Sequence, residues 1–281
     1  MLTGASMNQT SGKNALLTGA TGGIGPHIAR LLAANGINLV LSGRRADRLR
    51  DLSADLRSES VRIETATADL TRMGELKDLA DNAVSALGRI DILINNAGLE
   101  EVVPYQRQAP DQIQATVLTN VMAPLLLTRI LLPAMLARSD GHIISIASMA
   151  GRLAMPFGSA YSGTKAALSE WSLSLWMELQ GTGVKVTTIC PGFVTGAGMF
   201  ARKGRDAPGS LGSCTPEQVA EAVVKALHSN KPEILVNSMP VRPLMVLKSI
   251  SPVAAARLGD KMGLVAFLRS LTKRPDDANH D

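Results

Sequence analysis

Cysteine and aromatic residues are both scarce in this chain of 281 residues. Its two cysteines, Cys190 and Cys214, are too few for a disulfide framework, and no cluster of cysteine and histidine has the spacing of metal ligands. Aromatic residues make up 3% of the sequence, so the core must consist mainly of aliphatic side chains. Hydrophobic residues at 46%, against 19% charged residues, are enough for a large core, so we expect a folded rather than a disordered chain.

Long uninterrupted apolar runs are missing as well. The most apolar stretch, residues 121–137, is interrupted by Pro124, Arg129 and Pro133 and is too short for a convincing membrane span. The N-terminus has no charged segment followed by an apolar one, which is the pattern of a secretion signal. We therefore expect a cytoplasmic protein.

What the chain does have is a regular alternation of strand and helix patterns. Short apolar runs predict strands at 14–17, 38–42, 61–67, 90–94, 143–146, 185–189 and 233–236. Helical patterns lie between them, at 26–34, 46–58, 74–87, 111–138, 159–180 and 216–228. This order predicts an α/β fold, a single doubly wound Rossmann-type domain with a mostly parallel seven-stranded sheet and helices on both faces. We place the domain at residues 13–237 and expect residues 1–12 and 275–281 to be disordered.

A glycine-rich turn joins the first strand to the first helix. Residues 18–25 read Thr-Gly-Ala-Thr-Gly-Gly-Ile-Gly, and Pro26 follows at the first turn of the helix, where its missing N–H is tolerated. Such glycines let the backbone turn tightly and approach a pyrophosphate, which the helix N-terminus stabilises. In this context the motif predicts dinucleotide binding by Gly19, Thr21, Gly23, Ile24 and Gly25.

The end of the second strand bears on the choice of dinucleotide. A fold of this kind that prefers NAD has an acidic side chain there to bind the ribose hydroxyls. Here Gly43 is followed by Arg44 and Arg45, and guanidinium groups suit a 2′-phosphate. We therefore predict NADP(H) as the cofactor. The alternative is that the two arginines are only the basic start of the helix at 46–58.

A candidate catalytic group lies at residues 148–165, after the strand at 143–146. Tyr161 and Lys165 are four positions apart on a predicted helix, so their side chains share one face. A neighbouring ammonium lowers the pKa of a phenol, towards the range where tyrosine can exchange protons at neutral pH. Ser148, at the strand end, can hydrogen-bond to an oxygen that Tyr161 protonates. By itself this spacing also fits a surface tyrosine beside a solvated lysine.

Other strand ends supply the remaining candidates for cofactor contacts. They are Asp69 and Leu70 after the third strand, Asn96, Ala97 and Gly98 after the fourth, and Pro191, Gly192, Val194 and Thr195 after the sixth. Residues 196–213 follow without periodicity, and a loop of this length in a compact domain is typical of a lid.

Asn120 is a polar residue inside the apolar helix pattern at 111–138. Its simplest explanation is a side chain that hydrogen-bonds to its own helix and bends it.

These motifs, in this order and at these separations, resemble the short-chain dehydrogenase/reductase family over residues 13–237. The resemblance rests on Thr18, Gly19, Gly23, Gly25, Asp69, residues 95–98, Asn120, Ser148, Tyr161, Lys165, Pro191 and Gly192. One position departs from the family pattern, because Gly196 stands where the family often has threonine and Thr195 comes one residue earlier.

The resemblance implies a role for each of four side chains. Tyr161 would be the general acid/base, and Lys165 would lower its pKa and hold the nicotinamide ribose. Ser148 would orient the carbonyl group of the substrate, and Asn120 would join a water relay. The resemblance also implies a homodimer or homotetramer that assembles through the helices at 111–138 and 159–180.

Residues 238–274 form a basic extension that the family pattern does not cover, and we expect short helices packed on the same domain. Its charged residues are Arg242, Lys248, Arg257, Lys261, Arg269, Lys273 and Arg274, against Asp260. Apolar residues alternate with them, and Pro240, Pro243 and Pro252 interrupt the segment. Three explanations remain open: a cover over the substrate pocket, a contact with an anionic membrane surface, or a docking site for an acidic carrier protein.

The sequence thus predicts an oxidoreductase that transfers a hydride between NADP(H) and a carbonyl or alcohol substrate. Met149, Leu153 and Phe157 lie near the catalytic motif and suggest an apolar substrate, although packing explains them as well. The alternative is a non-catalytic NADP(H)-binding sensor or interaction protein, which has no need of the four catalytic side chains together. We expect no nucleic-acid partner.

Overall fold

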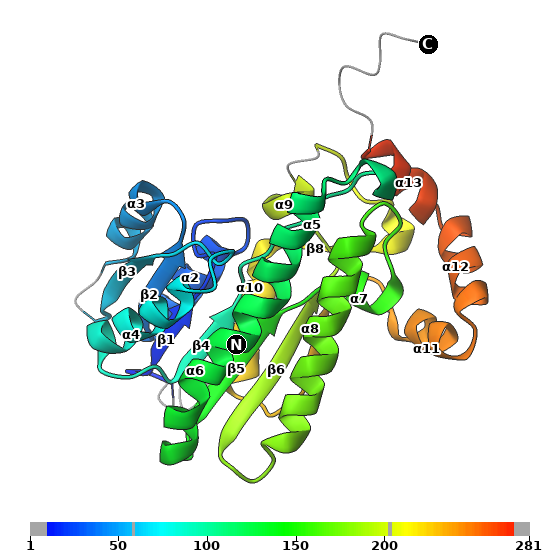
Figure 1. Ribbon diagram of the computed structural model, residues 1–281. Helices are drawn as coiled ribbons and strands as arrows, with labels where there is room; N and C mark the ends of the chain where they lie inside the picture. The colour runs from blue at the N-terminus through cyan, green and yellow to red at the C-terminus, as the bar shows by residue number, and fades with distance from the viewer. Residues whose placement is uncertain (1–9, 58–59, 202–203, 273–281) are drawn as a thin grey trace.

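A seven-stranded parallel sheet forms the centre of the computed structural model, which describes residues 10–57, 60–201 and 204–272. The strand order is β3-β2-β1-β4-β5-β6-β9, so the chain reverses its direction of winding between β1 and β4 (Figure 1). The strands are β1 (Asn14–Leu17), β2 (Asn38–Gly43), β3 (Ile63–Thr67), β4 (Ile92–Asn95), β5 (Gly141–Ile146), β6 (Val184–Pro191) and β9 (Glu233–Val236). The predicted doubly wound Rossmann-type fold is confirmed.

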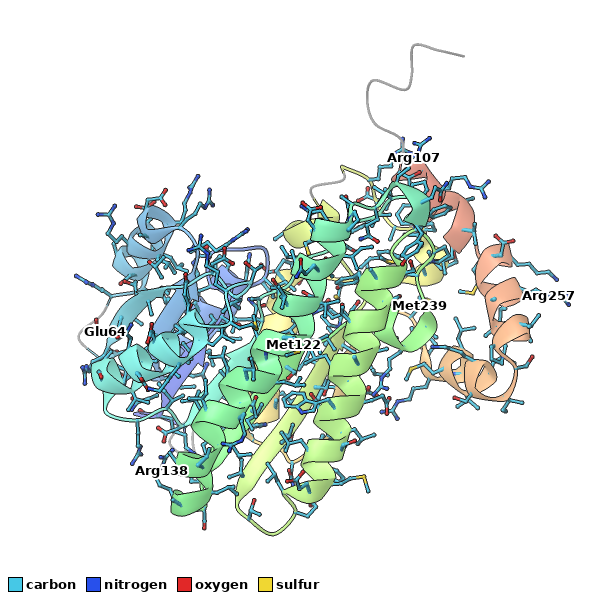
Figure 2. The ribbon with its side chains drawn as sticks, in the orientation of Figure 1. Glu64, Arg107, Met122, Arg138, Met239 and Arg257 are labelled. Atoms are coloured by element: carbon cyan, nitrogen blue, oxygen red, sulfur yellow. The ribbon has the colours of Figure 1, made fainter. Side chains whose placement is uncertain are left out.

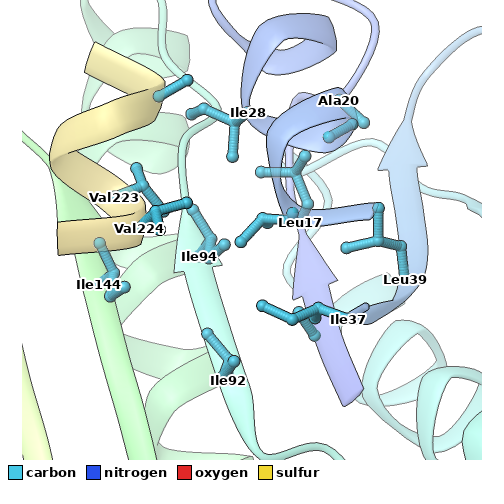
Figure 3. Packing of buried hydrophobic residues seen from close by; sticks show 14 of the residues in the cluster. Leu17, Ala20, Ile28, Ile37, Leu39, Ile92, Ile94, Ile144, Val223 and Val224 are labelled. Atoms are coloured by element: carbon cyan, nitrogen blue, oxygen red, sulfur yellow. The ribbon is translucent and has the colours of Figure 1, made fainter. Parts of the chain in front are cut away.

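Helices cover both faces of this sheet, because strand residues alternate between two apolar layers. On one face, Leu17 and Ile94 pack against α2 (Gly25–Ala34), α3 (Ala46–Leu56) and α10 (Pro216–Leu227), as Figure 3 shows for α2 and α10. On the other face, Leu16 and Leu93 pack against α4 (Glu75–Leu87), α6 (Ala123–Arg138) and α8 (Ser159–Glu178). Both layers are mainly aliphatic, as the shortage of aromatic residues requires.

The predicted single helix at 111–138 is divided into three parts in the structure. It consists of α5 (Pro110–Val117), a π-helical turn η2 (Leu118–Met122) and α6. By length and composition alone, Pro110–Arg138 could cross a membrane, since its most apolar window has a mean hydropathy of 1.6. In the structure, however, α6 packs against α4 and β5, and Leu127 and Met135 are fully buried there. It has the packing of a core helix.

Several short elements around the carboxyl ends of the strands were not predicted. One of them is α7 (Met149–Leu153), directly after β5. The segment 196–213 contains α9 (Gly198–Ala201) and a 3₁₀ turn η3 (Gly209–Leu211), and ends in β8 (Ser213–Cys214). β8 pairs with β7 (Phe193–Val194) as a second, two-stranded sheet. The expected unstructured loop is therefore partly regular in its described residues.

The C-terminal segment folds as three short helices at one side of the domain (Figure 1). They are α11 (Arg242–Ile250), α12 (Pro252–Lys261) and α13 (Leu264–Ser270). Leu268 of α13 packs with Val102, Met155 and Tyr161, whereas Met245 of α11 packs against a second small cluster that contains Met149 and Leu168. Lys273, Arg274 and the tail at 275–281 lie outside the described residues.

The N-terminal prediction of disorder also falls mostly outside the described residues. Residues 10–12 are described and form a turn in front of β1. The N–H of Gly12 donates to the carbonyl of Gly36 at 2.8 Å, and Thr10 is buried. The ordered chain therefore starts slightly before the predicted domain boundary.

Candidate active site

A large cavity of about 660 Å³ lies at the carboxyl ends of the strands, between the sheet and the C-terminal helices. Ligand sites in open α/β sheets occur at this edge, where the strand order reverses. The cavity brings together most of the predicted residues: Gly19, Thr21, Gly23, Ile24, Arg44, Asp69, Leu70, Asn96, Ala97, Gly98, Ser148, Tyr161, Lys165, Pro191, Gly192 and Val194. Gly25, Arg45, Asn120 and Thr195, by contrast, do not line it.

The glycine turn is locked to the end of β4 by reciprocal hydrogen bonds. The Asn96 side chain donates to the carbonyl groups of Thr18 (2.9 Å) and Gly19 (3.1 Å). The Thr18 hydroxyl in turn accepts from the backbone N–H groups of Asn96 (3.1 Å) and Ala97 (3.2 Å). Asn96, which the sequence placed among the cofactor contacts, therefore also fixes the shape of the turn.

Gly25 acts on the same turn from behind, although it does not line the cavity. A Cβ atom at this position would collide with the carbonyl oxygen of Gly19 and lie 2.6 Å from that of Ala20. Only glycine therefore lets α2 begin directly against the turn, which points the N-terminus of the helix into the cavity.

The space beside the glycine turn fits a dinucleotide phosphate. A Cβ atom built on Gly22 would meet nothing closer than 3.8 Å, so the backbone there is open to close approach. The segment that contains α9 covers another part of the turn, since a Cβ atom on Gly23 would lie 2.8 Å from the Cα atom of Gly198. This arrangement is a cradle of backbone groups at a helix N-terminus, the usual site for a pyrophosphate.

At one end of the cavity, Arg44 and Asp69 lie close enough to interact. The pKa of Asp69 is lowered mainly by a hydrogen bond of 3.0 Å from the backbone N–H of Thr71, and the charge of Arg44 lowers it further. Arg44 thus supplies a guanidinium group beside a carboxylate, at the end of β2 where a ribose would lie. Arg45, the other predicted arginine, is the N-cap residue of α3 and does not reach the cavity.

Tyr161 and Lys165 project from the first turns of α8 into the polar part of the cavity, and both are buried. The Lys165 Nζ atom lies 5.8 Å from the centre of the Tyr161 ring and donates to the carbonyl of Ile146 at 2.8 Å. Burial lowers the pKa of Lys165 to about 8, partly opposed by the charge of Glu100. The ammonium group is therefore close to titration at physiological pH.

The expected lowering of the Tyr161 pKa is wrong for the protein without ligands. Burial raises the pKa of the Tyr161 phenol, the charge of Glu100 raises it further, and a hydrogen bond with Ser148 opposes them. Desolvation of the anion outweighs the nearby ammonium here, because a buried phenolate loses its water. Tyr161 is a protonated phenol in this state.

Ser148 is held by the short helix that the sequence did not predict. It is the N-cap residue of α7, and its Oγ atom accepts a hydrogen bond from the N–H of Ala150 at 3.1 Å. That bond occupies a lone pair of Oγ, so the hydroxyl proton is available to donate, and in this structure the hydroxyl is hydrogen-bonded with Tyr161. A Cβ atom at Gly151 would lie 2.6 Å from the N atom of Ala166, so α7 sits directly on α8 and fixes Ser148 relative to Tyr161.

Asn120 lies in the π-helical turn η2 and is fully buried, one layer behind the cavity. Its side chain exchanges hydrogen bonds with the backbone of Leu99, at 2.8 and 2.9 Å, and donates to the Thr164 hydroxyl at 3.0 Å. It therefore bonds to other elements rather than to its own helix, unlike the simplest sequence explanation. A Cβ atom on Gly98 would lie 3.5 Å from both Asn120 Oδ1 and Lys165 Nζ, so the amide and the lysine both approach Gly98.

The sequence missed one ionisable group, Glu100, which lines the cavity and acts on both Tyr161 and Lys165. Its sequence position could have identified it as a site residue, because Glu100 stands two residues after the strand-end motif at 95–98. Thr195, a predicted cofactor contact, does not line the cavity. Its hydroxyl donates to the carbonyl of Cys214 at 3.3 Å, so it bonds to β8 outside the cavity lining.

Comparison with known proteins gives concordant matches. The family model for short chain dehydrogenases matches residues 13–207. A ketoacyl reductase, HetN, of a Nostoc species is 36% identical over 266 residues, which cover 93% of each protein. A metagenomic short-chain oxidoreductase solved in complex with NADP is 32% identical, with a TM-score of 0.70, over 82% of this chain and 99% of that one. A short-chain dehydrogenase from Streptomyces avermitilis is 28% identical, with a TM-score of 0.73, over 89% of this chain and 97% of that one.

Proposed function

This chain belongs to the short-chain dehydrogenase/reductase family and is an oxidoreductase, and we propose that it transfers a hydride between NADP(H) and an apolar carbonyl or alcohol substrate. One observation carries the proposal. Ser148, Tyr161 and Lys165 converge at the polar side of a cavity whose other side is apolar. This arrangement holds a carbonyl oxygen against a proton donor while the rest of the substrate stays out of water.

The nicotinamide, when bound, supplies or accepts the hydride. The Tyr161 hydroxyl donates its proton to the carbonyl oxygen during reduction, and its raised pKa keeps it in the acid form that this direction needs. When a substrate is bound, the Ser148 hydroxyl, which is hydrogen-bonded with Tyr161 in this structure, donates to the same carbonyl oxygen and orients it. Lys165, as an ammonium group, stabilises the negative charge that Tyr161 acquires when it gives up its proton.

Asn120 acts indirectly in this proposal. Through Leu99 it fixes the backbone between Gly98 and Glu100, and so the position of Glu100 beside Tyr161 and Lys165. Its contact with Thr164 fixes the same backbone to α8. The water relay implied by the family resemblance is a further proposal, and the approach of both Asn120 and Lys165 to Gly98 supports it.

The preference for NADP(H) rests on Arg44. Its guanidinium group lies in the cavity at the end of β2, where an acidic residue would favour NAD. The related oxidoreductase solved with NADP supports the same choice. Arg45 makes a smaller contribution in this proposal, because it does not line the cavity.

The substrate class follows from the apolar side of the cavity. Its lining includes Met199 and Phe200 of α9 and Leu244, Leu258 and Val265 of the C-terminal helices. Such a surface suits a fatty, ketoacyl or steroid-like carbonyl compound better than a sugar or an organic acid. The name of the Nostoc relative, a ketoacyl reductase, agrees with an acyl substrate.

We also propose that the enzyme is a cytoplasmic homodimer or homotetramer. The layer formed by α5, η2, α6 and α8 leaves large apolar side chains exposed: Val117, Met122, Leu136 and Met177. Met122 lies in the middle of this layer (Figure 2). Apolar residues of this kind on one face are what a second copy would bury.

The proposal is tested with a panel of carbonyl compounds and NADPH. We expect the absorbance of NADPH to fall with at least one fatty, ketoacyl or steroid-like ketone. When NADH replaces NADPH, the same ketone should be reduced much more slowly. Binding of NADPH, followed by its fluorescence, must accompany this activity. Tight NADPH binding without turnover on any member of the panel would instead favour a non-catalytic sensor.

A further inference from the structure

The outer side of α11 and α12 presents a surface that the oxidoreductase chemistry does not use. On α11, Arg242, Val246 and Ile250 are four residues apart, and on α12 the same holds for Val253, Arg257 and Lys261. Residues four apart lie on one side of a helix. We call these six residues the outer face. Arg257 projects from it away from the sheet (Figure 2).

The centre of the outer face is apolar and unusually exposed. The exposed fractions are 59% for Val246, 78% for Ile250 and 61% for Val253. Ile250 ends α11 and Val253 belongs to the first turn of α12, so both residues lie at the junction of the two helices. The basic residues lie further along the helices, with Arg242 at the start of α11 and Lys261 at the end of α12.

The fold does not need the outer face for its own packing. The inner side of α12 buries Ala255 and Gly259, and that of α11 packs Met245 against the domain. Lys248 anchors α11 by donating to the carbonyl of Arg152 at 2.7 Å. The two helices are therefore held by their inner sides, and the exposed apolar side chains of the outer face have no packing partner among the described residues.

We propose that the outer face docks on an anionic lipid bilayer, with Val246, Ile250 and Val253 inserted between the headgroups and the basic residues bound to lipid phosphates. The projecting aliphatic residues match the apolar region beneath the headgroups, and the Lys and Arg residues around them match the anionic headgroups. Asp260 is the acidic residue of α11–α13, against five basic ones: Arg242, Lys248, Arg257, Lys261 and Arg269. The outer face itself contains three of these basic residues, Arg242, Arg257 and Lys261, and no acidic one, so it is complementary in charge to an anionic membrane.

A protein partner fits the outer face less well. A second copy of the chain would place the same basic residues opposite each other across a two-fold axis, and like charges repel. Binding sites for other proteins usually centre on aromatic or arginine anchors that enter pockets. Here the centre consists of short aliphatic side chains that project from a helix junction.

The position of the cavity adds a consequence. Leu258 of α12 lines the cavity, is 41% exposed and directly follows Arg257, so this wall of the cavity lies beside the outer face. A carbonyl compound dissolved in the bilayer could enter directly from the docked state. This consequence rests on the proposed function, whereas docking depends only on the two helices.

Co-sedimentation of the full chain with lipid vesicles tests docking without any measurement of activity. We expect binding to vesicles that contain phosphatidylglycerol, at least about tenfold weaker binding to pure phosphatidylcholine, and a marked loss in high salt. Ile250→Ser combined with Val253→Ser should weaken binding to anionic vesicles at least about tenfold. Val84→Ser, at an exposed apolar residue of α4 that lies outside both the outer face and the proposed subunit contact, is the control and should bind like the wild type.

A second pair of variants tests the charges. Arg257→Glu with Lys261→Glu should weaken binding to anionic vesicles at least about tenfold, since each basic residue near such a surface adds to binding. Arg48→Glu with Arg50→Glu makes the same change of charge on α3, at the other end of the molecule, and should weaken it far less (Figure 1). Circular dichroism of each variant shows whether it is folded.

Three outcomes would overturn the proposal. The first is no binding to either kind of vesicle by the wild type. The second is equal losses in the outer-face variants and their folded controls. The third is binding to polyglutamate but not to anionic vesicles, which would assign the face to an acidic protein instead.

Discussion

The two walls of the cavity are built in different ways. The polar wall consists of the glycine turn, residues 96–98, Ser148, Tyr161 and Lys165, and backbone groups and hydrogen bonds hold it in place. The apolar wall consists of Leu244, Leu258, Met262, Leu264 and Val265 from α11–α13. Side-chain packing holds it, together with hydrogen bonds such as those from Lys248 to Arg152 and from Ser210 to Met262.

This difference separates chemistry from substrate choice. Proton transfer needs atoms placed within a fraction of an ångström, and close backbone contacts such as that of Gly151 with Ala166 provide such placement. An apolar wall only has to exclude water and match a shape, so its side chains can vary without loss of the reaction. We therefore expect variants of the polar wall to affect binding and turnover of the cofactor, and variants of the apolar wall to affect the substrate.

The largest effect should come from Gly25→Ala, which breaks the support of the polar wall. The added methyl group would collide with the backbone of Gly19 and Ala20, so the turn and α2 must move apart. We expect a loss of about 1–3 kcal/mol in the free energy of unfolding and at least about a hundredfold loss of NADPH affinity, equal to about 2.7 kcal/mol.

Gly74→Ala is the matched control, because nothing lies within 4 Å of its added methyl group and its φ angle of −64° suits alanine. Chemical denaturation and NADPH titration measure both variants. Unchanged NADPH affinity in Gly25→Ala would show that the turn does not form the cofactor site.

The next effect concerns one end of the polar wall. Arg44→Ala removes the guanidinium group proposed for the 2′-phosphate, and a charge-assisted hydrogen bond contributes about 1.5–3 kcal/mol. We expect NADPH affinity to fall roughly 10- to 100-fold, while NADH affinity stays nearly constant. Titrations with both cofactors, with Arg45→Ala as the neighbouring control, measure this. An equal loss for both cofactors would contradict the NADP assignment.

A smaller effect should appear in the pH dependence. The charge of Glu100 raises the pKa of both Tyr161 and Lys165, so Glu100→Gln should lower both. Lys165, with a pKa of about 8, loses its charge as the pH rises through that value. The alkaline fall in kcat/KM for NADPH, which reports on the free enzyme, should therefore move to lower pH in Glu100→Gln.

Glu101→Gln removes the neighbouring carboxylate, which is outside the cavity lining, and should leave this profile in place. A move of the Glu100→Gln profile to higher pH would contradict the assigned electrostatics, because loss of the Glu100 charge should lower the pKa of both Tyr161 and Lys165.

The smallest effect should be confined to the apolar wall. Ser210→Ala removes the hydrogen bond of 2.9 Å to the carbonyl of Met262, at the end of α12. A bond of this kind contributes about 1 kcal/mol, so amides of α12 and α13 should exchange about fivefold faster. Amides of β1 and β4 should be unaffected. Ser249→Ala removes a bond within α11 and is the control. Faster exchange throughout the sheet would show that the two walls are not separate units.

Sequence predicted the polar wall better than the apolar one for a physical reason. The glycine turn and the strand ends are local features, since each motif lies next in sequence to the strand that positions it. The spacing of apolar residues predicts the strand, and the glycines predict the turn. The strands were accordingly placed within a few residues of their observed bounds, and the doubly wound order followed from their alternation with helices.

The missed features depend on contacts between distant segments. The π-helical turn at Asn120 requires Leu99 and Thr164, which come from other elements. The raised pKa of Tyr161 depends on burial, which the spacing of Tyr161 and Lys165 does not reveal. A cover over the substrate pocket was one of three explanations for the C-terminal segment, and α11–α13 do line the cavity. The sequence alone could not show which residues of the segment face inward, because that depends on contacts with distant elements.

The steady-state constants of two variants, each changed by a single hydroxyl, test whether the polar wall performs the chemistry and the apolar wall selects the substrate. Tyr161→Phe removes a hydroxyl from the polar wall, and Val265→Thr adds one to the apolar wall. With NADPH and an apolar ketone, we expect Tyr161→Phe to lower kcat at least about a hundredfold with NADPH binding retained. Val265→Thr should raise KM roughly 3- to 10-fold with little change in kcat. Turnover by Tyr161→Phe at the wild-type rate would contradict the account.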